Sequence, residues 1–470
     1  MANFFKAASK PRLASQQITV TIDKLDMNGV GIARGKKKPI FIAGALPNET
    51  VVAKVFEQKN KYTRAKLMSI EKSSEKRVLP KCQHFGVCGG CDLQMLDLDE
   101  QLRFKQNKVA ELFSRSFAAH AIANNTEKLQ LPWSEAVKSQ PWHYRRKARL
   151  GVQFNKTHQV TVGFRQKSTN QLATIKSCPV LVEPLNNIFP LLKTLISKLT
   201  VKSAIGHIEV IKAEVCEHNN SNGTKEQVVL VVRQLKAMSE SDINLWQDFA
   251  ENYNCRIMVD DGISQQCLTD DKEGDVSETD IAPLIYKLAD NSQITFATSD
   301  FIQVNHQVNI EMINQALAWL KLEPTDIVLD LFCGLGNFSL SLARKAKFVV
   351  GVEGVQAMVD KASYNAELNN ITNSQFYQAD LNSNWLSNAW ASEQKFTKVL
   401  LDPARAGAEQ AVEQLVCLKV PQILYVSCDP ATLAKDSAIL VSHGYKIEKI
   451  ALMDMFSQTK HVETMVLFKK

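Results

Sequence analysis

One cysteine stands where a nucleophile could act. Cys428 ends the apolar, β-like run QILYVSC and is followed directly by Asp429-Pro430. Proline suits the first turn of a helix, so we expect a helix to begin there. A thiol beside a helix N-terminus feels its partial positive charge, which favours the thiolate. Single cysteines are more often small core residues. Cys428, however, lies at the end of a strand, where the substrates of open α/β sheets bind, and this position favours a nucleophile.

Methylation at a pyrimidine carbon is a chemistry that needs such a thiolate. C5 of uracil is a poor nucleophile, and addition of a thiolate at C6 makes C5 an enolate-like carbon that can attack a sulfonium methyl. A base must then remove the C5 proton so that the thiol can leave. Glu463 in KHVETMVLF, on an expected late strand, is the candidate base. By position alone a glutamate there is usually solvated, and Asp402 is a second candidate.

Polar residues follow four successive strand-like runs in the C-terminal part. DIVLDLF leads into residues 333–337 (CGLGN), FVVGVE ends in Glu353, SQFYQAD ends in Asp380, and KVLLD ends in Asp402. The carboxyl ends of parallel strands meet at one edge, so these side chains are placed to bind a ribose and an adenine. A lone Gly-x-Gly is weak evidence. Ser339 replaces the third glycine of a dinucleotide fingerprint, which favours S-adenosylmethionine over NAD.

Three cysteines are clustered near residue 90. Cys82, Cys88 and Cys91 are closely spaced, and Cys178-Pro179 offers a fourth thiol. Four thiolates suit either Zn²⁺ or an iron–sulfur cluster, and the spacing alone leaves both open. Disulfides are not expected, because the N-terminus lacks the apolar core and cleavage site of a signal peptide and the thiols of a cytoplasmic protein stay reduced.

Length and charge indicate a multidomain protein that meets nucleic acid. A chain of 470 residues is too long for one ordinary domain. No apolar run is long enough to span a membrane, so a cytoplasmic protein is expected. Residues 1–81 carry 17 Lys and Arg against 6 Asp and Glu, whereas the whole chain has a net charge of +7. Because this positive charge is interleaved with strand-like residues, it favours a phosphate-binding domain over a merely solvated surface.

The N-terminal part reads as a small β-barrel after a loose arm over residues 1–15. From Gln17 to Lys72 short β-like runs alternate with turn signals at Asn28-Gly29, Gly35 and Pro47-Asn48. A domain of this size and pattern predicts a closed or nearly closed barrel of the oligonucleotide-binding type over residues 15–73. This segment resembles a TRAM domain, a small RNA-binding barrel.

The rest of the chain divides into two predicted domains. Residues 74–296 read as an α+β central domain with a helix near residues 93–120, later strands, and an acidic insert around Gln265–Asp280. If HYRRKARLGVQF is a strand, Arg145, Lys147 and Arg149 lie on one face. This basic face could follow a phosphate backbone, with Trp142 or Tyr144 stacking on bases, or it could be a solvated edge strand. Residues 297–470 alternate strands and helices, which predicts an α/β, Rossmann-like class I methyltransferase domain.

The C-terminal motifs resemble those of the RNA uracil-C5 methyltransferase family. SDFIQVN, DLFCGLGNFSL, LLDPARAG, SCDPATLAKD and HVETM follow one another in the family's order over residues 297–465. The resemblance implies that Cys428 is the nucleophile and Glu463 the general base. It also implies a set of residues that bind S-adenosylmethionine, namely Gln303, Phe332, Asn337, Glu353, Asp380 and Asp402.

The resemblance also implies a cluster and a substrate. Relatives with the same cysteine pattern carry a [4Fe–4S] cluster, here on Cys82, Cys88, Cys91 and Cys178. A barrel combined with these cysteines is similar to the branch of the family that forms 5-methyluridine in 23S ribosomal RNA, with no membrane and no obligate protein partner. The alternatives are another RNA, such as transfer RNA or a different ribosomal uridine, a non-catalytic RNA-binding assembly factor, and a cluster-containing oxidoreductase with a nucleotide cofactor.

Overall fold

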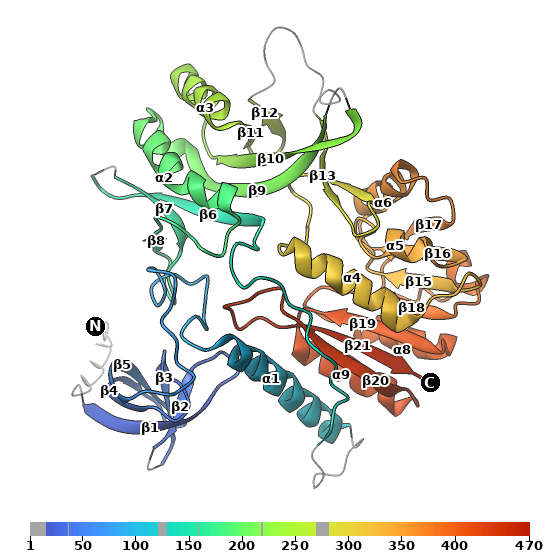
Figure 1. Ribbon diagram of the computed structural model, residues 1–470, viewed down its shortest axis with the longest axis horizontal. Coiled ribbons are helices and arrows are strands. Elements are labelled where there is room, and N and C mark those ends of the chain that lie inside the picture. Colours follow the sequence, from blue (N-terminus) through green and yellow to red (C-terminus); the bar gives the residue numbers. More distant parts are fainter. Residues whose placement is uncertain (1–15, 36, 121–128, 158, 218–219, 269–281) are drawn as a thin grey trace, which may run out of the picture. The chain divides into compact units, whose positions relative to one another are not determined.

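The described residues form two compact units. The computed structural model describes residues 16–470 apart from 36, 121–128, 158, 218–219 and 269–281 (Figure 1). The predicted arm and most of the acidic insert therefore lie outside the described residues. One unit holds the described residues up to Gly86, with Cys91–Phe104 and Gln458–Lys460. The other holds Val87–Gly90, Lys105–Ser457 and His461–Lys470, without the gaps named above.

The first unit contains a closed β-barrel, as the alternating pattern predicts. Its strands are β1 (Gln17–Leu25), β2 (Gly31–Arg34), β3 (Pro39–Ala43), β4 (Thr50–Gln58) and β5 (Thr63–Lys72). They close in the order β1-β2-β3-β5-β4. Ile22, Ile42 and Val51 fill the interior, because alternate side chains of a strand point to one face. Gly29 and Asn48 have φ angles of 77° and 67° in two of the predicted turns.

Helix α1 (Leu98–Ala119) lies within the predicted range 93–120. Val109, Phe113 and Phe117 recur at four-residue intervals and therefore share one face of the helix. These side chains are buried in the same apolar cluster as residues of the C-terminal sheet. This part of α1 thus contributes to the core of the second unit.

The central part of the second unit is an α+β layer. Its strands are β6 (Lys147–Phe154), β7 (Val160–Arg165), β8 (Leu172–Thr174), β9 (Ile205–Glu217), β10 (Asn220–Gln234), β11 (Cys255–Asp260), β12 (Gln265–Cys267), β13 (Leu284–Lys287) and β14 (Gln293–Phe296). Among the described residues the main order is β12-β11-β10-β9-β6-β7-β8, and β13 pairs with β9 and β14. Helices α2 (Glu183–Lys198) and α3 (Glu240–Tyr253) bury Phe189 and Trp246 in the core of this layer, and a 3-10 turn, η1 (Lys202–Ala204), precedes β9.

The basic face predicted in HYRRKARLGVQF is largely engaged within the chain. Strand β6 begins at Lys147, so Arg145 precedes it. The Lys147 ammonium donates to the Asp300 carbonyl at 2.9 Å, and the Arg149 guanidinium donates to the Glu209 carboxylate at 2.9 Å. The hypothesis that this strand follows a phosphate backbone is therefore weakened, since two of its cations already have protein partners.

The C-terminal part is a doubly wound sheet, as the repeated strand–helix pattern predicts. Its strands are β15 (Ile327–Leu331), β16 (Phe348–Glu353), β17 (Ser374–Gln378), β18 (Lys398–Leu401), β19 (Gln422–Ser427), β20 (Lys446–Met453) and β21 (Glu463–Lys469). Among the described residues their order is β17-β16-β15-β18-β19-β21-β20. Strands β15 to β19 are parallel, whereas β21 runs antiparallel between β19 and β20. The order reverses between β15 and β18, where ligands of such sheets bind.

Helices cover both faces of this sheet (Figure 1). They are α4 (His306–Leu320), α5 (Ser339–Ala343), α6 (Gln356–Leu368), α7 (Ala389–Ser392), α8 (Glu409–Leu418) and α9 (Pro430–Ser442). Val328 lies in one buried cluster with α4, α5 and α6, and the next residue, Leu329, lies in another with α1, α8 and α9. The strands are thus buried on both sides, which explains their nearly continuous apolar sequences. None of the helices in the described ranges has the length and apolarity needed to cross a bilayer.

Candidate active site

The turn after β15 leaves its backbone open to a ligand. Phe332, Gly334 and Gly336 have φ angles of 62°, 54° and 88°. A phenylalanine in the left-handed region is strained, and such strain persists mainly at functional sites. A Cβ at Gly334 would meet no described heavy atom within 4 Å, whereas one at Gly336 would meet Leu340 at 3.4 Å. Gly334 therefore suits the approach of a ligand, and Gly336 suits the packing of the following helix.

Glu353 and Asp380 lie at neighbouring strand ends, as predicted. Glu353 is the last residue of β16, and its carboxylate accepts the Gly334 N–H at 3.2 Å and the Gly354 N–H at 2.8 Å. A carboxylate has about four acceptor sites, so others remain for a ribose hydroxyl. Asp380 follows β17, is exposed, and accepts the Asn382 N–H at 2.9 Å. Both carboxylates are thus held by backbone amides at the edge where a nucleoside would bind.

Asn337 and Gln303 are held by residues of α4 and of the central layer. The Asn337 carboxamide exchanges two hydrogen bonds of 2.9 Å with Asn309, and its oxygen also accepts the Tyr286 hydroxyl at 3.1 Å. The buried Arg146 guanidinium lies over the Tyr286 ring at 4.4 Å and donates to the Gln303 carbonyl at 2.9 Å. The positions of the two predicted donor-binding residues therefore depend on residues that no strand-end motif indicates.

Asp330 is a buried carboxylate that the strand-end pattern did not single out as a site residue. It lies within β15, is 1% exposed, and accepts the Ser339 hydroxyl at 2.5 Å through one oxygen. Its other oxygen has no hydrogen-bond partner in the described residues. Burial, followed by the nearby charges of Asp402 and Glu353, raises the pKa of Asp330 to about 7. A charged residue inside the apolar run IVLDL was the available signal.

The acidity of this edge fits the methyl donor. S-adenosylmethionine carries a sulfonium and an ammonium cation, and Asp330, Glu353 and Asp402 are close enough for their charges to interact. Burial also raises the pKa of Asp402 to about 7. A cationic ligand would stabilise the ionised carboxylates and give the unpartnered Asp330 oxygen a donor. The residues present therefore suit this donor in charge and in hydrogen-bonding capacity.

Cys428 and Glu463 face each other across two antiparallel strands. Ser427, the last residue of β19, pairs with Thr464 of β21, so continuation of this register places Cys428, the residue after β19, opposite Glu463. The two groups also interact electrostatically. Side chains directly opposite in such a pair have Cβ atoms about 5 Å apart. Cys428 is half-buried and Glu463 is 3% exposed. The fold thus brings together two residues that are 35 positions apart in the chain.

The helix predicted after Cys428 is present, but its effect on the thiol is outweighed. Helix α9 begins at Pro430, and Asp429 caps it by accepting the Ala431 N–H at 2.8 Å. Burial, together with Glu463 and Asp402, raises the pKa of Cys428 to about 11. The expectation of a thiolate is therefore wrong for the protein alone, because desolvation and two carboxylates exceed the pull of the helix terminus.

The positive charge of Arg405 partly offsets the effect of these carboxylates on the pKa values of the site. This charge lowers the pKa of both Cys428 and Glu463, although burial and Asp402 still raise the pKa of Glu463 well above its ordinary value. Arg405 is exposed and follows β18 in the run DPARAG, three residues after Asp402. A cation beside a predicted strand-end carboxylate was a usable signal, and the sequence analysis missed it.

The candidate aromatic residues differ in their exposure. Tyr144 is 7% exposed and its hydroxyl donates to the Ser457 carbonyl at 2.9 Å. The suggestion that Tyr144 stacks on a base is therefore not supported. Trp142 is half-buried. Phe301, two residues before Gln303, is 77% exposed. Exposed aromatic rings can stack on extruded bases, and the sequence analysis did not select this one.

The four cysteines predicted to bind an iron–sulfur cluster are distributed between the two units. Cys82 and Cys91 belong to the first unit, and Cys88 and Cys178 belong to the second. All four are half-buried. In the described part of the chain, no group of three or more His, Cys, Asp or Glu side chains is arranged to hold a metal ion. The geometry therefore does not by itself support a cluster, which stays a prediction from spacing and resemblance.

Comparison with known families decides the family of the chain. Residues 117–470 match the family described as tRNA (Uracil-5-)-methyltransferase, and residues 11–68 match the TRAM domain. The chain belongs to the tRNA (Uracil-5-)-methyltransferase family. The first match confirms the predicted resemblance and the methyltransferase class, and the second confirms the predicted TRAM domain.

Three relatives of this uracil-5-methyltransferase, each matched over almost its whole length, have the same name. A protein of Colwellia psychrerythraea is 64% identical over all of this chain and 99% of its own length. Proteins of Vibrio cholerae and Aliivibrio fischeri are 43% and 41% identical over the full length of both chains. All three are named 23S rRNA (uracil(1939)-C(5))-methyltransferase RlmD.

A solved structure has the same fold as this uracil-5-methyltransferase family protein. The tRNA (uracil-54, C5)-methyltransferase of Pyrococcus abyssi, in complex with S-adenosyl-L-homocysteine, has a TM-score of 0.69 and 22% sequence identity. The match covers 96% of this chain and 100% of that one. At this identity the likeness shows the fold, a methyltransferase fold in the C-terminal part.

Proposed function

We propose that this protein transfers a methyl group from S-adenosylmethionine to C5 of a uridine in 23S ribosomal RNA. The observation that carries the chemistry is the pair of Cys428 and Glu463, opposite each other beside an acidic donor edge. A nucleophile and a base on one side of a pyrimidine ring are what methylation at carbon requires. The proposed donor-binding residues are Gln303, Phe332, Asn337, Glu353, Asp380 and Asp402.

The reaction proceeds through a covalent adduct. Cys428 loses its thiol proton to solvent, the thiolate sulfur adds to C6, and the electrons of the C5–C6 double bond move toward C5 and the ring carbonyl. C5 then attacks the methyl carbon of the sulfonium, whose carbon–sulfur bond breaks and releases S-adenosylhomocysteine. Glu463 removes the C5 proton, the double bond re-forms, and the bond between C6 and sulfur breaks. In each step electrons move in pairs as one bond forms and another breaks, so no oxidant or reductant is needed.

The donor also prepares the nucleophile. In the protein alone, burial, Glu463 and Asp402 raise the pKa of Cys428 to about 11, and burial and Asp402 raise the pKa of Glu463 well above its ordinary value. A sulfonium cation beside Asp402 favours the charged forms of all three groups. Thiolate formation is therefore coupled to donor binding, which protects the thiol from reaction in the absence of donor.

The choice of ribosomal RNA rests on the relatives and on the barrel. The full-length relatives at 41–64% identity are named for a uridine of 23S rRNA. On the barrel, Lys54 and Lys66 are exposed and pair directly across β4 and β5, with Phe56 59% exposed nearby on β4. Like charges directly opposite are unfavourable unless an anion neutralises them, which phosphates would do. Such a substrate places the enzyme in the cytoplasm.

The test of this function is a map of 5-methyluridine in 23S ribosomal RNA from cells with and without the gene. We expect one or more uridines to lose their methyl group in the deletion and to regain it when the purified protein and S-adenosylmethionine are added. Methylation of transfer RNA with no change in ribosomal RNA would contradict the substrate and leave the chemistry standing.

A [4Fe–4S] cluster on Cys82, Cys88, Cys91 and Cys178 is part of the proposal. Its support is the spacing of these half-buried thiols and the family resemblance. Protein purified without oxygen should contain about four irons per chain. The variant Cys91→Ser should lose most of that iron, whereas Cys417→Ser, at an exposed position on α8, should keep it. Stoichiometric zinc, or no metal, would contradict the cluster.

A further inference from the structure

The segment between β20 and β21 is a buried irregular strap that ends at the proposed base. This strap, Asp454–Val462, joins Met453 to Glu463, which face each other as a pair in the two strands. Loops usually lie on the surface, but several strap residues are less than 10% exposed, namely Asp454, Met455, Ser457, Gln458, Thr459 and Val462. Hairpin loops typically have two to five residues, so this connection of nine residues is longer than most.

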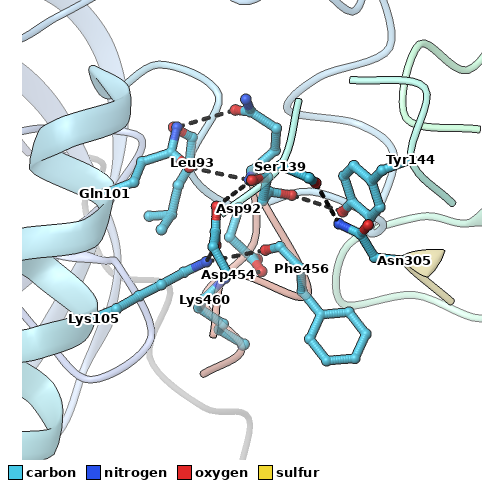
Figure 2. A network of polar contacts seen from close by, with 12 residues as sticks. Asp92, Leu93, Gln101, Lys105, Ser139, Tyr144, Asn305, Asp454, Phe456 and Lys460 are labelled. Atoms are coloured by element: carbon cyan, nitrogen blue, oxygen red, sulfur yellow. Dashed lines mark hydrogen bonds and ion pairs between the residues drawn. The ribbon is translucent and has the colours of Figure 1, made fainter. Parts of the chain in front are cut away.

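The first half of the strap is fastened by a buried lysine. The Lys105 ammonium on α1 donates to the Asp454 carboxylate at 2.6 Å and to the Phe456 carbonyl at 3.1 Å (Figure 2). Lys105 is 2% exposed, and lysine is rarely buried without such partners. The Asp454 carboxylate also accepts the Ser457 hydroxyl, and the Ser457 carbonyl accepts the Tyr144 hydroxyl at 2.9 Å.

The tip of the strap is fastened by Gln101, one helical turn before Lys105. The Gln101 carboxamide donates to the Gln458 side chain at 3.0 Å and accepts the Gln458 N–H at 3.1 Å. The Gln458 carbonyl accepts the N–H groups of Asp92 and Leu93, each at 3.0 Å. The Asp92 carboxylate also accepts the Lys460 N–H at 3.4 Å (Figure 2). Residues four apart share a helix face, so Gln101 and Lys105 act from the same side of α1.

The tip is held in a conformation that it would not adopt alone. Gln458 is 2% exposed and has a φ angle of 70°, in the left-handed region that disfavours side chains other than glycine. Strained residues of this kind persist only where their surroundings fix them, and they cluster at functional sites. Gln101, Asp92 and Leu93 provide that fixation, because they satisfy both backbone groups of Gln458.

We propose that α1, through Gln101 and Lys105, is the positioning element for the general base. By holding the strap at its tip and its first half, these two side chains keep the Met453–Glu463 pair closed and thereby set the place of the Glu463 carboxylate opposite Cys428. This inference rests on the proposed function and deepens it. Gln101 and Lys105 are positioning residues, since they act on the reaction only through the strap.

The position of the strap predicts which step depends on it. The donor edge is formed by β15 to β18, whereas the strap joins β20 to β21. Release of the strap should therefore spare donor binding and methyl transfer and slow removal of the C5 proton. A displacement of about 1 Å can cost about 100-fold in rate. The methylated protein–RNA adduct should accumulate, as it should when Glu463 itself is replaced.

The experiment compares Gln101→Met with Gln106→Met, a half-buried glutamine on the same helix. The full-length variants are incubated with 23S ribosomal RNA and methyl-labelled S-adenosylmethionine. Three quantities are measured: affinity for S-adenosylhomocysteine by calorimetry, the rate of the first methyl transfer, and the fraction of labelled protein–RNA adduct on a denaturing gel. For Gln101→Met we expect affinity within about twofold of wild type, adduct decay slowed about 10- to 100-fold, and visible adduct. Gln106→Met should match wild type.

Two results would overturn the positioning role. One is adduct decay at the wild-type rate in Gln101→Met, and the other is a parallel loss of donor affinity, methyl transfer and decay, which indicates general damage to the fold. If Gln101→Met does not fold, Gln101→Glu, which keeps an acceptor for the Gln458 N–H, is judged by the same two results. Glu463→Gln separates this inference from the proposed function: adduct with Glu463→Gln but none with the α1 variants refutes only the positioning role, whereas no adduct with Glu463→Gln refutes the base assignment.

Discussion

Replacement of Cys428 by alanine should reduce methyl transfer to RNA by about 10⁴-fold or more while leaving affinity for S-adenosylhomocysteine within about twofold. The physical reason is that C5 of uracil is too weakly nucleophilic without addition at C6, and no other described cysteine lies at this strand end. The donor edge is built by β15 to β18, so a smaller side chain after β19 does not disturb it. Single-turnover transfer of labelled methyl and calorimetry with S-adenosylhomocysteine measure the two effects.

Cys417→Ala is the matched control for this variant. Cys417 is exposed on α8, and its thiol lies 3.7 Å from the Glu413 carbonyl, so its loss should leave methyl transfer unchanged. Methyl transfer by Cys428→Ala at a rate within about tenfold of wild type would contradict covalent catalysis. It would point instead to direct attack by the ring, and the pairing of Cys428 with Glu463 would then need another explanation.

Much of the fold could be predicted because its elements follow local rules. The barrel strands alternate buried and exposed residues, and Gly29 and Asn48 supply the left-handed angles of their turns. The C-terminal strands are buried on both faces and therefore have nearly continuous apolar sequences. The predicted start of β6 was less successful, because Arg145 and Arg146 lie just before the strand and bind other segments. Contacts between distant segments leave no local pattern.

The candidate site was predictable only in part for the same reason. Glu353, Asp380, Asp402 and Cys428 lie at or just after strand ends, and parallel strands bring such residues to one edge whatever the rest of the chain does. The ionisation of the site was not predictable, because burial and neighbouring carboxylates raise the pKa of Cys428 to about 11 against the effect of the helix terminus. These effects depend on tertiary packing, which sequence spacing does not report.

The supporting residues left still weaker signals. Gln101 and Lys105 belong to an amphipathic helix, where polar side chains are usually solvated, yet both are less than 5% exposed. Their partners, Gln458 and Asp454, are about 350 positions away along the chain. Nothing in the spacing of these residues indicates a contact. Residues that position a catalytic group are therefore harder to predict than the catalytic group itself.

Replacement of Glu463 by glutamine should trap a covalent protein–RNA adduct. Glutamine has nearly the same shape and can still donate and accept hydrogen bonds, but it cannot take the C5 proton. Addition by Cys428 and transfer of the methyl group should proceed, and release of the product should slow by about 10²- to 10⁴-fold. The adduct should carry the labelled methyl group and migrate with the protein on a denaturing gel.

The control and the rival base make this prediction decisive. Glu448→Gln, at an exposed position paired with Lys469, should release its product as wild type does. Asp402 is the alternative base, since its own pKa of about 7 suits proton transfer near neutral pH. If Asp402 removes the proton, Glu463→Gln should turn over without adduct and Asp402→Asn should accumulate it. Because Asp402 lies at the donor edge, Asp402→Asn should also weaken donor binding, and Glu463→Gln should not. Donor affinity and adduct together therefore assign the two carboxylates their separate roles.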